Sequence, residues 1–403
     1  MAGPLSGIRV LEFSQVIAAP FAGQVLTDLG AEVLKVEPPE GESWRLQASF
    51  AEKESKAYQC LNRGKRCLTL HMSRPESREI VHRLIPDFDA VLINYRPDAA
   101  ARFGIDYPTL SKIKPDLVYV DLTAFGRHGQ WADRPGYDGA VQAVSGLMAA
   151  EGKTREDESP GTISFTAIAD YGSGCVLADA LISGLYHRER TGEGQMIECS
   201  LLATALNLQP EVVMEHPVAD SERNLRRATR RKRASEGAPY SELLSIRAPH
   251  DPSDFHHRVY LTADGAIVVA AETADEIASV RKVFALGESI SQQDIGRLEA
   301  ELELRTADSV LQCLFDAGIP ASPVNLTEEM SIHPQVRDNG WMFDLNHPAT
   351  GAQRAIRNPL CFSASPAEPA GPSPMLGQDT TLVLSRLGYS ASEIDALRAQ
   401  GVI

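Results

Sequence analysis

The stretch that decides the fold is GIRVLEFSQVIAAPFAGQVLTDLGAEVLKVEPPEG, residues 7–41. Its first part, residues 7–13, is rich in apolar and β-branched residues, as a short strand is. Pro20 opens a helical pattern with apolar residues on one side, and Gly30 suits the position just after a helix. Residues 31–37 then predict a second strand, which stops at two prolines. This succession of strand, helix and strand predicts a βαβ unit in a parallel sheet.

The same alternation continues along the N-terminal half of the chain. Strands are predicted at 67–72, 90–95 and 117–125, with helices at 76–85 and 108–113 between them. The pattern predicts an α/β fold for this region. The first strand is not followed by the glycine-rich dinucleotide fingerprint, so a nicotinamide cofactor is not expected.

Composition divides the chain into four segments. Residues 1–207 are predicted to form a large α/β domain, and residues 208–257, where turn formers and arginines accumulate, a linker. Residues 258–329 read as a small α+β domain that starts with a hairpin. Residues 330–403 begin as a proline-rich extended segment and end in two helical patterns.

Charge and composition exclude several classes of protein. With 403 residues and 43% hydrophobic content, the chain can build a core without disulfides. A net charge of −15 argues against general nucleic-acid binding. The basic run at 222–233 matches a nuclear-localisation or nucleic-acid patch, but a solvated linker is favoured in so acidic a protein.

Cysteine usage and hydropathy predict a cytoplasmic protein. The six cysteines form no CxxC pair and no zinc-like grouping with histidine, so no metal is expected. No signal peptide is evident, and no apolar run is long enough to cross a membrane.

A carboxylate inside FTAIADYGSGC, residues 165–175, is the first candidate for chemistry. Asp170 ends an apolar run, and Gly172 and Gly174 follow it. The local pattern fits a helix-capping aspartate and equally a nucleophile that something large must approach. It does not decide between them, although the cap is the more common use of such a residue.

Polar and basic residues make up the second set of candidates. Asn94 and Arg96 end a predicted strand at the edge where α/β folds bind ligands. Arg102 follows closely, so both guanidinium groups could converge on one ligand. Lys65, together with Arg74, forms a small basic island suited to a phosphate, although solvated loops are the plainer interpretation in each case. In a separate glycine-dense loop, Tyr137 could offer a hydroxyl to a site.

Taken together, these segments resemble the class III CoA-transferase family, the formyl-CoA transferase or CaiB/BaiF type. The resemblance spans most of the chain and is weakest at 208–257. It is carried by residues 7–41 and by these blocks: NRGKRCLTLHM, LINYRPDAAARFGIDYPTL, KPDLVYVDLTAFGRHGQWADRPGYD, RERTGEGQMIECSLL and SPMLGQDTTLVLSRLGYSASEIDALRAQGVI.

The resemblance implies a fold and an assembly. It implies a Rossmann-like large domain built from both termini, so that residues 330–403 return to it, plus the smaller α+β domain. It also implies two chains threaded through one another as an interlocked homodimer. Coenzyme A enters as the acyl-CoA substrate, and no tightly bound cofactor is expected.

The resemblance also implies a reaction and its residues. Asp170 falls on the family's catalytic aspartate, while Asn94, Arg96 and Arg102 fall where family members hold CoA. We expect transfer of CoA from an acyl-CoA to a free carboxylic acid through an aspartyl anhydride and an aspartyl-CoA thioester. A helix start is expected to keep Asp170 ionised, and N–H groups beside Gly172 are expected to face the oxyanions.

Three alternatives stay open. Family members that act as α-methylacyl-CoA racemases or epimerases use a histidine where this chain has Tyr137, which favours transfer. An intramolecular CoA transferase or a non-catalytic CoA-binding protein is also compatible with the sequence. Ile17 and Pro38 depart from some members, the former where oxalate-type enzymes have glutamine, and a shielding glycine loop has no clear counterpart here.

Overall fold

A computed structural model describes residues 2–151, 153–157, 159–162, 166–246 and 252–403 of the chain. Phe165, which opens the stretch around Asp170, lies outside the described residues, as do residues 247–251 of the expected linker. The chain divides into two compact units. One comprises Met1–Leu244 and Gly340–Ile403, and the other Ser245–Asn339.

The stretch at 7–41 folds as a strand, a helix and a strand. These elements are β1 (Arg9–Phe13), α1 (Ala18–Asp28) and β2 (Glu32–Glu37). The helix begins at Ala18 rather than at Pro20, because a proline is tolerated in the first turn, where its missing N–H would have no partner. Gly30 has a φ of +99° just after the helix, which confirms the predicted glycine stop.

One parallel sheet organises the first unit. Its order is β3-β2-β1-β4-β5-β6, the order of doubly wound folds, so the predicted α/β class is confirmed. The order reverses between β1 and β4, the point at which such sheets bind ligands. The remaining strands are β3 (Arg66–Thr69), β4 (Ala90–Ile93), β5 (Val118–Thr123) and β6 (Gln195–Ser200).

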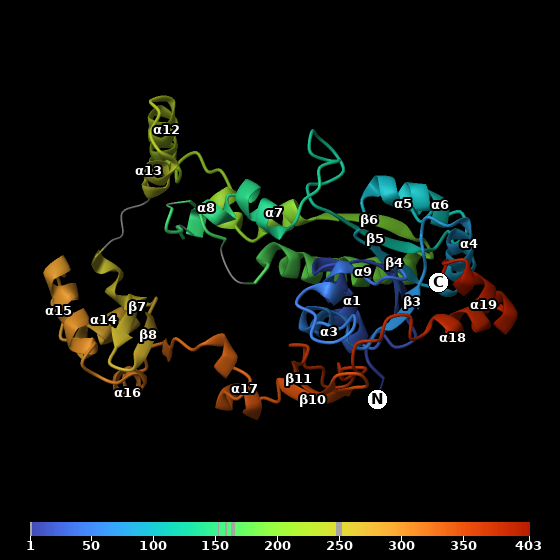
Figure 1. The fold of residues 1–403 in the computed structure, drawn as a ribbon. Helices are drawn as coiled ribbons and strands as arrows, with labels where there is room; N and C mark the ends of the chain where they lie inside the picture. The colour runs from blue at the N-terminus through green and yellow to red at the C-terminus, as the bar shows by residue number, and fades with distance from the viewer. Residues whose placement is uncertain (1, 152, 158, 163–165, 247–251) are drawn as a thin grey trace. The chain divides into compact units, whose positions relative to one another are not determined.

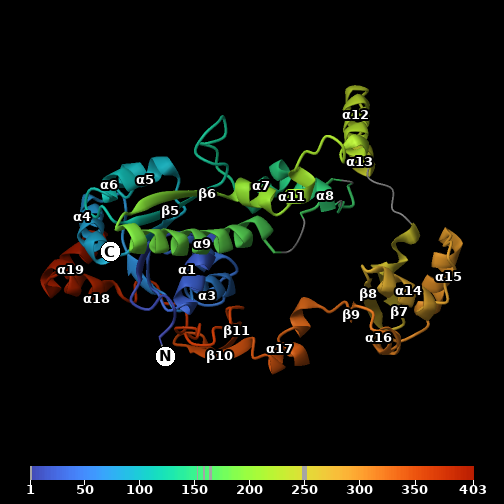
Figure 2. The same cartoon turned by 180° about the vertical axis from the view of Figure 1, so that it is seen from behind.

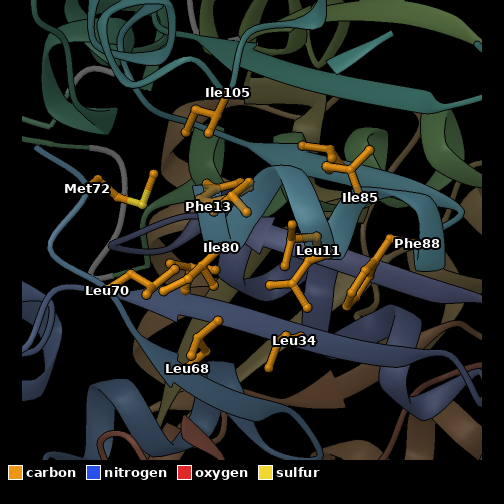
Figure 3. Close-up of a cluster of buried hydrophobic side chains, with 14 of the residues drawn as sticks. Leu11, Phe13, Leu34, Leu68, Leu70, Met72, Ile80, Ile85, Phe88 and Ile105 are labelled. Atoms are coloured by element: carbon orange, nitrogen blue, oxygen red, sulfur yellow. The ribbon is translucent and has the colours of Figure 1, made fainter. Parts of the chain in front are cut away.

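Helices cover both faces of this sheet (Figures 1 and 2). On one face Leu11 and Leu34 pack against α4, α5 and the C-terminal helices α18 and α19, in the cluster of Figure 3. On the other face Val10 and Val33 pack against α1, α7, α9 and α10. Successive strand residues therefore face opposite layers, as a fully buried parallel sheet requires. The bounds are α4 (Pro75–Leu84), α5 (Pro97–Phe103), α7 (Asp138–Ser145), α9 (Ile168–Thr191), α10 (Leu201–Asn207), α18 (Thr380–Arg386) and α19 (Ala391–Ala399).

Shorter elements complete the first unit. They are α2 (Ser43–Leu46), α3 (Lys56–Asn62), η1 (Ile85–Asp87), α6 (Tyr107–Leu110), α8 (Leu147–Glu151) and the antiparallel pair β10 (Met342–His347) and β11 (Gly351–Ile356).

The expected linker is largely helical where it is described. It contains α11 (Pro210–Val213), α12 (Ser221–Ser235) and α13 (Tyr240–Ser245). The basic run lies on α12, which buries none of its residues. Several of its arginines pair with acids nearby, for example Arg233 with Glu242. Mutual pairing of charges explains how so polar a helix forms.

The second unit is a small α+β structure. Its sheet has the order β7-β8-β9, and the predicted hairpin is confirmed as β7 and β8. Its core includes Tyr260, Val269 and Leu314. Its elements are η2 (Pro252–His256), β7 (His257–Thr262), β8 (Gly265–Ala270), α14 (Ala274–Val283), α15 (Gln292–Leu302), α16 (Ala307–Asp316), β9 (Ala321–Pro323), η3 (Thr327–Glu329) and α17 (Pro334–Asp338).

Candidate active site

A pocket of about 90 Å³ lies at the carboxyl ends of β1, β4 and β5. It stands where the strand order of the sheet reverses. Its lining includes residues 15–18 after β1, Asn94 after β4 and residues 122–124 at the end of β5. Tyr137 and Asp170 line it as well. Three predicted site residues are thus brought together at the edge that binds ligands in doubly wound folds.

Asp170 is the only acid in this lining. Its residue is 7% exposed, and its carboxylate has no hydrogen bond or ion pair with any described residue. Burial, followed by the charge of Asp138, raises the pKa of Asp170 to about 7. The helix start therefore does not keep the pKa of Asp170 at an ordinary aspartate's value, because burial and the charge of Asp138 raise it. Near neutral pH the protonated and the ionised forms of the carboxyl are therefore both populated.

The cap of α9 is Asp138, which sequence reasoning did not identify as a functional residue. Its Oδ1 accepts the N–H groups of Ala169 at 2.7 Å and Asp170 at 3.3 Å. Asp170 itself lies in the first turn and makes no capping hydrogen bond, so the capping interpretation of Asp170 is wrong. Asp138 starts α7, directly after Tyr137, and only the packing of α7 against α9 brings it to this position.

Gly172 and Gly174 lie inside α9, so the turn expected after Asp170 is absent. Their N–H groups are engaged by the helix and cannot serve an oxyanion. A Cβ on Gly174 would lie 2.8 Å from the Ala18 carbonyl oxygen, and one on Gly172 would lie 3.3 Å from the Thr204 side chain. These glycines instead let α9 pack closely against α1 and α10.

Free backbone donors are found at the start of α1. No side chain caps this helix, and no acid lies in its first turn. Among the described residues, no acceptor contacts the N–H groups of Ile17, Ala18 or Ala19. Ile17 and Ala18 line the same pocket as Asp170. Unpaired N–H groups at a helix start favour a negative charge nearby.

Asn94 is engaged by the protein rather than free for a ligand. Its Nδ2 donates to the Gln15 carbonyl oxygen at 2.8 Å, and its Oδ1 accepts the Gln15 N–H at 3.1 Å. The side chain therefore fixes the loop between β1 and α1. Tyr137 is 68% exposed and precedes α7, where its side chain borders the pocket.

Arg96 and Arg102 converge on Asp98. The Nε of Arg96 lies 3.2 Å from Asp98 Oδ1, and Nη1 of Arg102 lies 3.9 Å from Asp98 Oδ2. All three side chains are more than half exposed. The two cations thus sit at the carboxyl end of β4, where a ligand phosphate could replace the surface carboxylate.

Lys65, in the basic island at 62–66, is engaged by the protein rather than free for a ligand. Lys65 is 5% exposed, and its Nζ donates to Glu12 Oε1, the Pro20 carbonyl oxygen and Asn62 Oδ1 at 2.8–2.9 Å. Burial lowers the pKa of Lys65 to about 8, although Glu12 opposes the shift. These contacts do not support the expectation that Lys65 binds substrate. Arg74 is exposed at the start of α4 and stays a candidate.

No cluster of histidine, cysteine or acidic residues in the described part of the chain could hold a metal ion. None of the helices described is both long and apolar enough to cross a bilayer.

The chain is similar to known proteins over nearly its whole length. The model of CoA-transferase family III matches residues 5–380. A succinate–glutarate CoA-transferase of Agrobacterium fabrum is 33% identical, over 95% of this chain and 96% of that protein. A succinyl-CoA:glutarate CoA-transferase of Mus musculus is 31% identical, over 99% of this chain and 90% of that protein. The crystal structure of a CAIB/BAIF family protein from Brucella suis aligns with a TM-score of 0.75 at 27% identity, over 96% of this chain and 100% of that one.

Proposed function

The chain belongs to CoA-transferase family III, and from this premise we propose that Asp170 is the nucleophile through which it transfers CoA. The single observation that carries the proposal is the state of this carboxylate. It is buried and has no described partner, yet it opens onto a pocket at the switch point of the sheet. A structural aspartate so deeply buried would be paired.

The reaction exchanges one acyl group for another on CoA. The Asp170 carboxylate attacks the carbonyl carbon of the donor thioester, the C–S bond breaks, and CoA leaves as a thiolate. The thiolate then attacks the aspartyl carbonyl of the mixed anhydride, which releases the donor acid and forms an aspartyl-CoA thioester. The acceptor carboxylate attacks this thioester, the C–S bond breaks, and CoA leaves again as a thiolate, so that a second anhydride forms. Attack of the thiolate on the acceptor's acyl carbon gives the new acyl-CoA and restores Asp170.

The raised pKa of Asp170 suits this role. A carboxylate that binds its proton more tightly is a stronger nucleophile, provided that it is ionised when it attacks. With a pKa of about 7, a substantial fraction is ionised at neutral pH. The protein therefore keeps a reactive carboxylate available under ordinary conditions.

Every step passes through a tetrahedral oxyanion on a carbonyl near Asp170. The unpaired N–H groups at the start of α1 line the same pocket and are the donors that we assign to this charge. Removing one such donor in other enzymes costs about 10²–10³ in rate. This assignment replaces the one expected for the N–H groups beside Gly172.

Arg96 and Arg102 are assigned to the nucleotide end of CoA. Both are exposed at the carboxyl end of β4, on the same edge of the sheet as the pocket. Guanidinium groups pair with phosphates and stack on purines. Arg74, exposed after β3 on the same edge, is a further candidate for a CoA phosphate, and Tyr137 for a contact near the acyl group.

We also propose that two copies of the chain associate. Four apolar residues in and around α11 and α12 are each more than 60% exposed, namely Val212, Met214, Val218 and Leu225. Apolar residues gathered in this way on a soluble protein favour association. Sedimentation equilibrium would show a dimer mass, whereas a monomer at micromolar concentration would contradict the proposal.

The decisive experiment follows CoA between two acids. Wild type, Asp170→Asn and Asp170→Ala are incubated with succinyl-CoA and a panel of mono- and dicarboxylic acids in D₂O, and products are read by mass spectrometry. We expect exchange in the wild type only, a peptide containing Asp170 that hydroxylamine converts to a hydroxamate, and no deuterium at Cα. Exchange by either variant would remove Asp170 as nucleophile. Deuterium incorporation without an acceptor would indicate a racemase instead.

A further inference from the structure

Val16, in the loop between β1 and α1, has a left-handed backbone with a φ of +73°. This conformation is unusual for a β-branched residue. Strained backbone persists only where the surrounding structure holds it, and it concentrates at active sites. The loop that contains Val16 lines the pocket of Asp170.

A buried carboxylate holds this residue. The Val16 N–H donates to Glu42 Oε2 at 2.8 Å. Glu42 is 3% exposed, and its other oxygen, Oε1, lies 3.0 Å from Nζ of the fully buried Lys35. A buried carboxylate is tolerated when such a partner compensates for its lost solvation.

Other side chains contact the backbone on both sides of Val16. Lys35 Nζ donates to the Ser14 carbonyl oxygen at 2.9 Å, just before the strained residue. Lys65 Nζ donates to the Pro20 carbonyl oxygen at 2.8 Å, in the first turn of α1. Asn94 fixes both backbone groups of Gln15. The path of the backbone into α1 is therefore set by Asn94, which lines the pocket, and by buried side chains such as Glu42 and Lys35, which do not.

We propose that Glu42, supported by Lys35, is a positioning residue that keeps Val16 left-handed and thereby aims the first N–H groups of α1 at the carbonyl carbon attached to Asp170. The inference rests on the proposed function. Without the carboxylate, Val16 relaxes to negative φ, and the peptide leading to Ile17 rotates. The donors then miss the oxyanion. Because an oxyanion forms only during reaction, the loss falls on kcat rather than on KM.

Glu42→Gln tests the proposal with little change in volume. The amide has one oxygen, so it can satisfy the Val16 N–H or Lys35 but not both. We expect kcat for CoA exchange to fall by about tenfold or more, since misaligned oxyanion donors cost rate, with the KM for acyl-CoA within about threefold. Glu54→Gln is the matched control. Glu54 is an equally buried carboxylate, paired with Arg45 at 3.2 Å, and contacts none of residues 14–20.

A double-mutant cycle separates positioning from loss of stability. Glycine adopts positive φ without strain. In the V16G background, residue 16 should therefore depend less on Glu42 to keep its left-handed backbone. We expect the kcat penalty of E42Q to shrink to about threefold or less in V16G, a coupling that a general loss of stability would not produce. An equal penalty in both backgrounds would overturn the proposal, as would full kcat in E42Q.

A second variant keeps the test decisive if E42Q does not fold. Val16→Pro removes the N–H that Glu42 accepts and forces φ to about −65°, while the Glu42 and Lys35 side chains stay unchanged. We expect V16P to lose far more kcat than V16G, because only proline excludes the left-handed backbone, and equal rates in the two would overturn the proposal. Failure of the proposed function is seen separately, because then the wild type itself would form no hydroxylamine-sensitive adduct on Asp170.

Discussion

Replacing Asp170 with asparagine should stabilise the folded protein, by an amount that grows with pH. The pKa of Asp170 is about 7 in the folded chain, against 3.8 for an ordinary aspartate. A carboxyl that binds its proton more tightly when folded lowers the free energy of unfolding as pH rises between those two values, and the cost is complete above the higher one. Asparagine has nearly the same shape and no charge to bury.

The size of the gain follows from the same two values. Each pKa unit corresponds to about 1.4 kcal/mol. At pH 8 the full difference gives about 4 kcal/mol, and at pH 5 less than half of it has developed. The variant should therefore be more stable than the wild type at both pH values, with most of the gain appearing between them.

Urea unfolding followed by tryptophan fluorescence measures this gain. The protein's three tryptophans, Trp44, Trp131 and Trp341, all belong to the unit that contains Asp170, so the signal reports on that unit. Asp179→Asn, an exposed site on the same helix, is the control and should stay within about 0.5 kcal/mol of wild type. A D170N protein no more stable than wild type at pH 8, or a gain independent of pH, would refute the reasoning.

Three further predictions test other parts of the site. The kcat/KM for acyl-CoA should rise with pH and level off above about 7, because the free enzyme reacts with Asp170 ionised; a rise centred near pH 4 in a pH–rate profile would contradict this. Lys65→Met should lower the free energy of unfolding by about 3 kcal/mol, because Glu12 loses a buried partner, and leave the KM for acyl-CoA unchanged; a raised KM would restore Lys65 as a ligand contact. Arg102→Ala should raise the KM for acyl-CoA several-fold with little change in kcat. Arg386→Ala, in a cavity at the opposite edge of the sheet, is the control and should leave the KM unchanged. Equal KM values for the two variants in steady-state kinetics would count against the CoA assignment.

Local pattern was sufficient for the elements of the large unit. The alternation of apolar strands with helical patterns and the glycine stop at Gly30 each depend on residues close in sequence. The order of motifs was likewise enough to predict the family, which the matching of residues 5–380 confirms. Asp170 could be selected as a candidate because it ends an apolar run, although its neighbours could not say what it does.

The geometry around Asp170 depended on contacts between distant parts of the chain. Asp138 caps α9 from another helix, and burial by several elements sets the pKa of Asp170, so neither could be deduced from the glycines beside it. Lys65 illustrates the same limit: a basic residue near turn formers looked exposed, but packing placed it against Glu12. Sequence by itself determined which segments are strands and helices and which acid could react. Only the tertiary structure decided that acid's protonation, its cap and its backbone donors, because desolvation and hydrogen bonding depend on neighbours in space rather than in sequence.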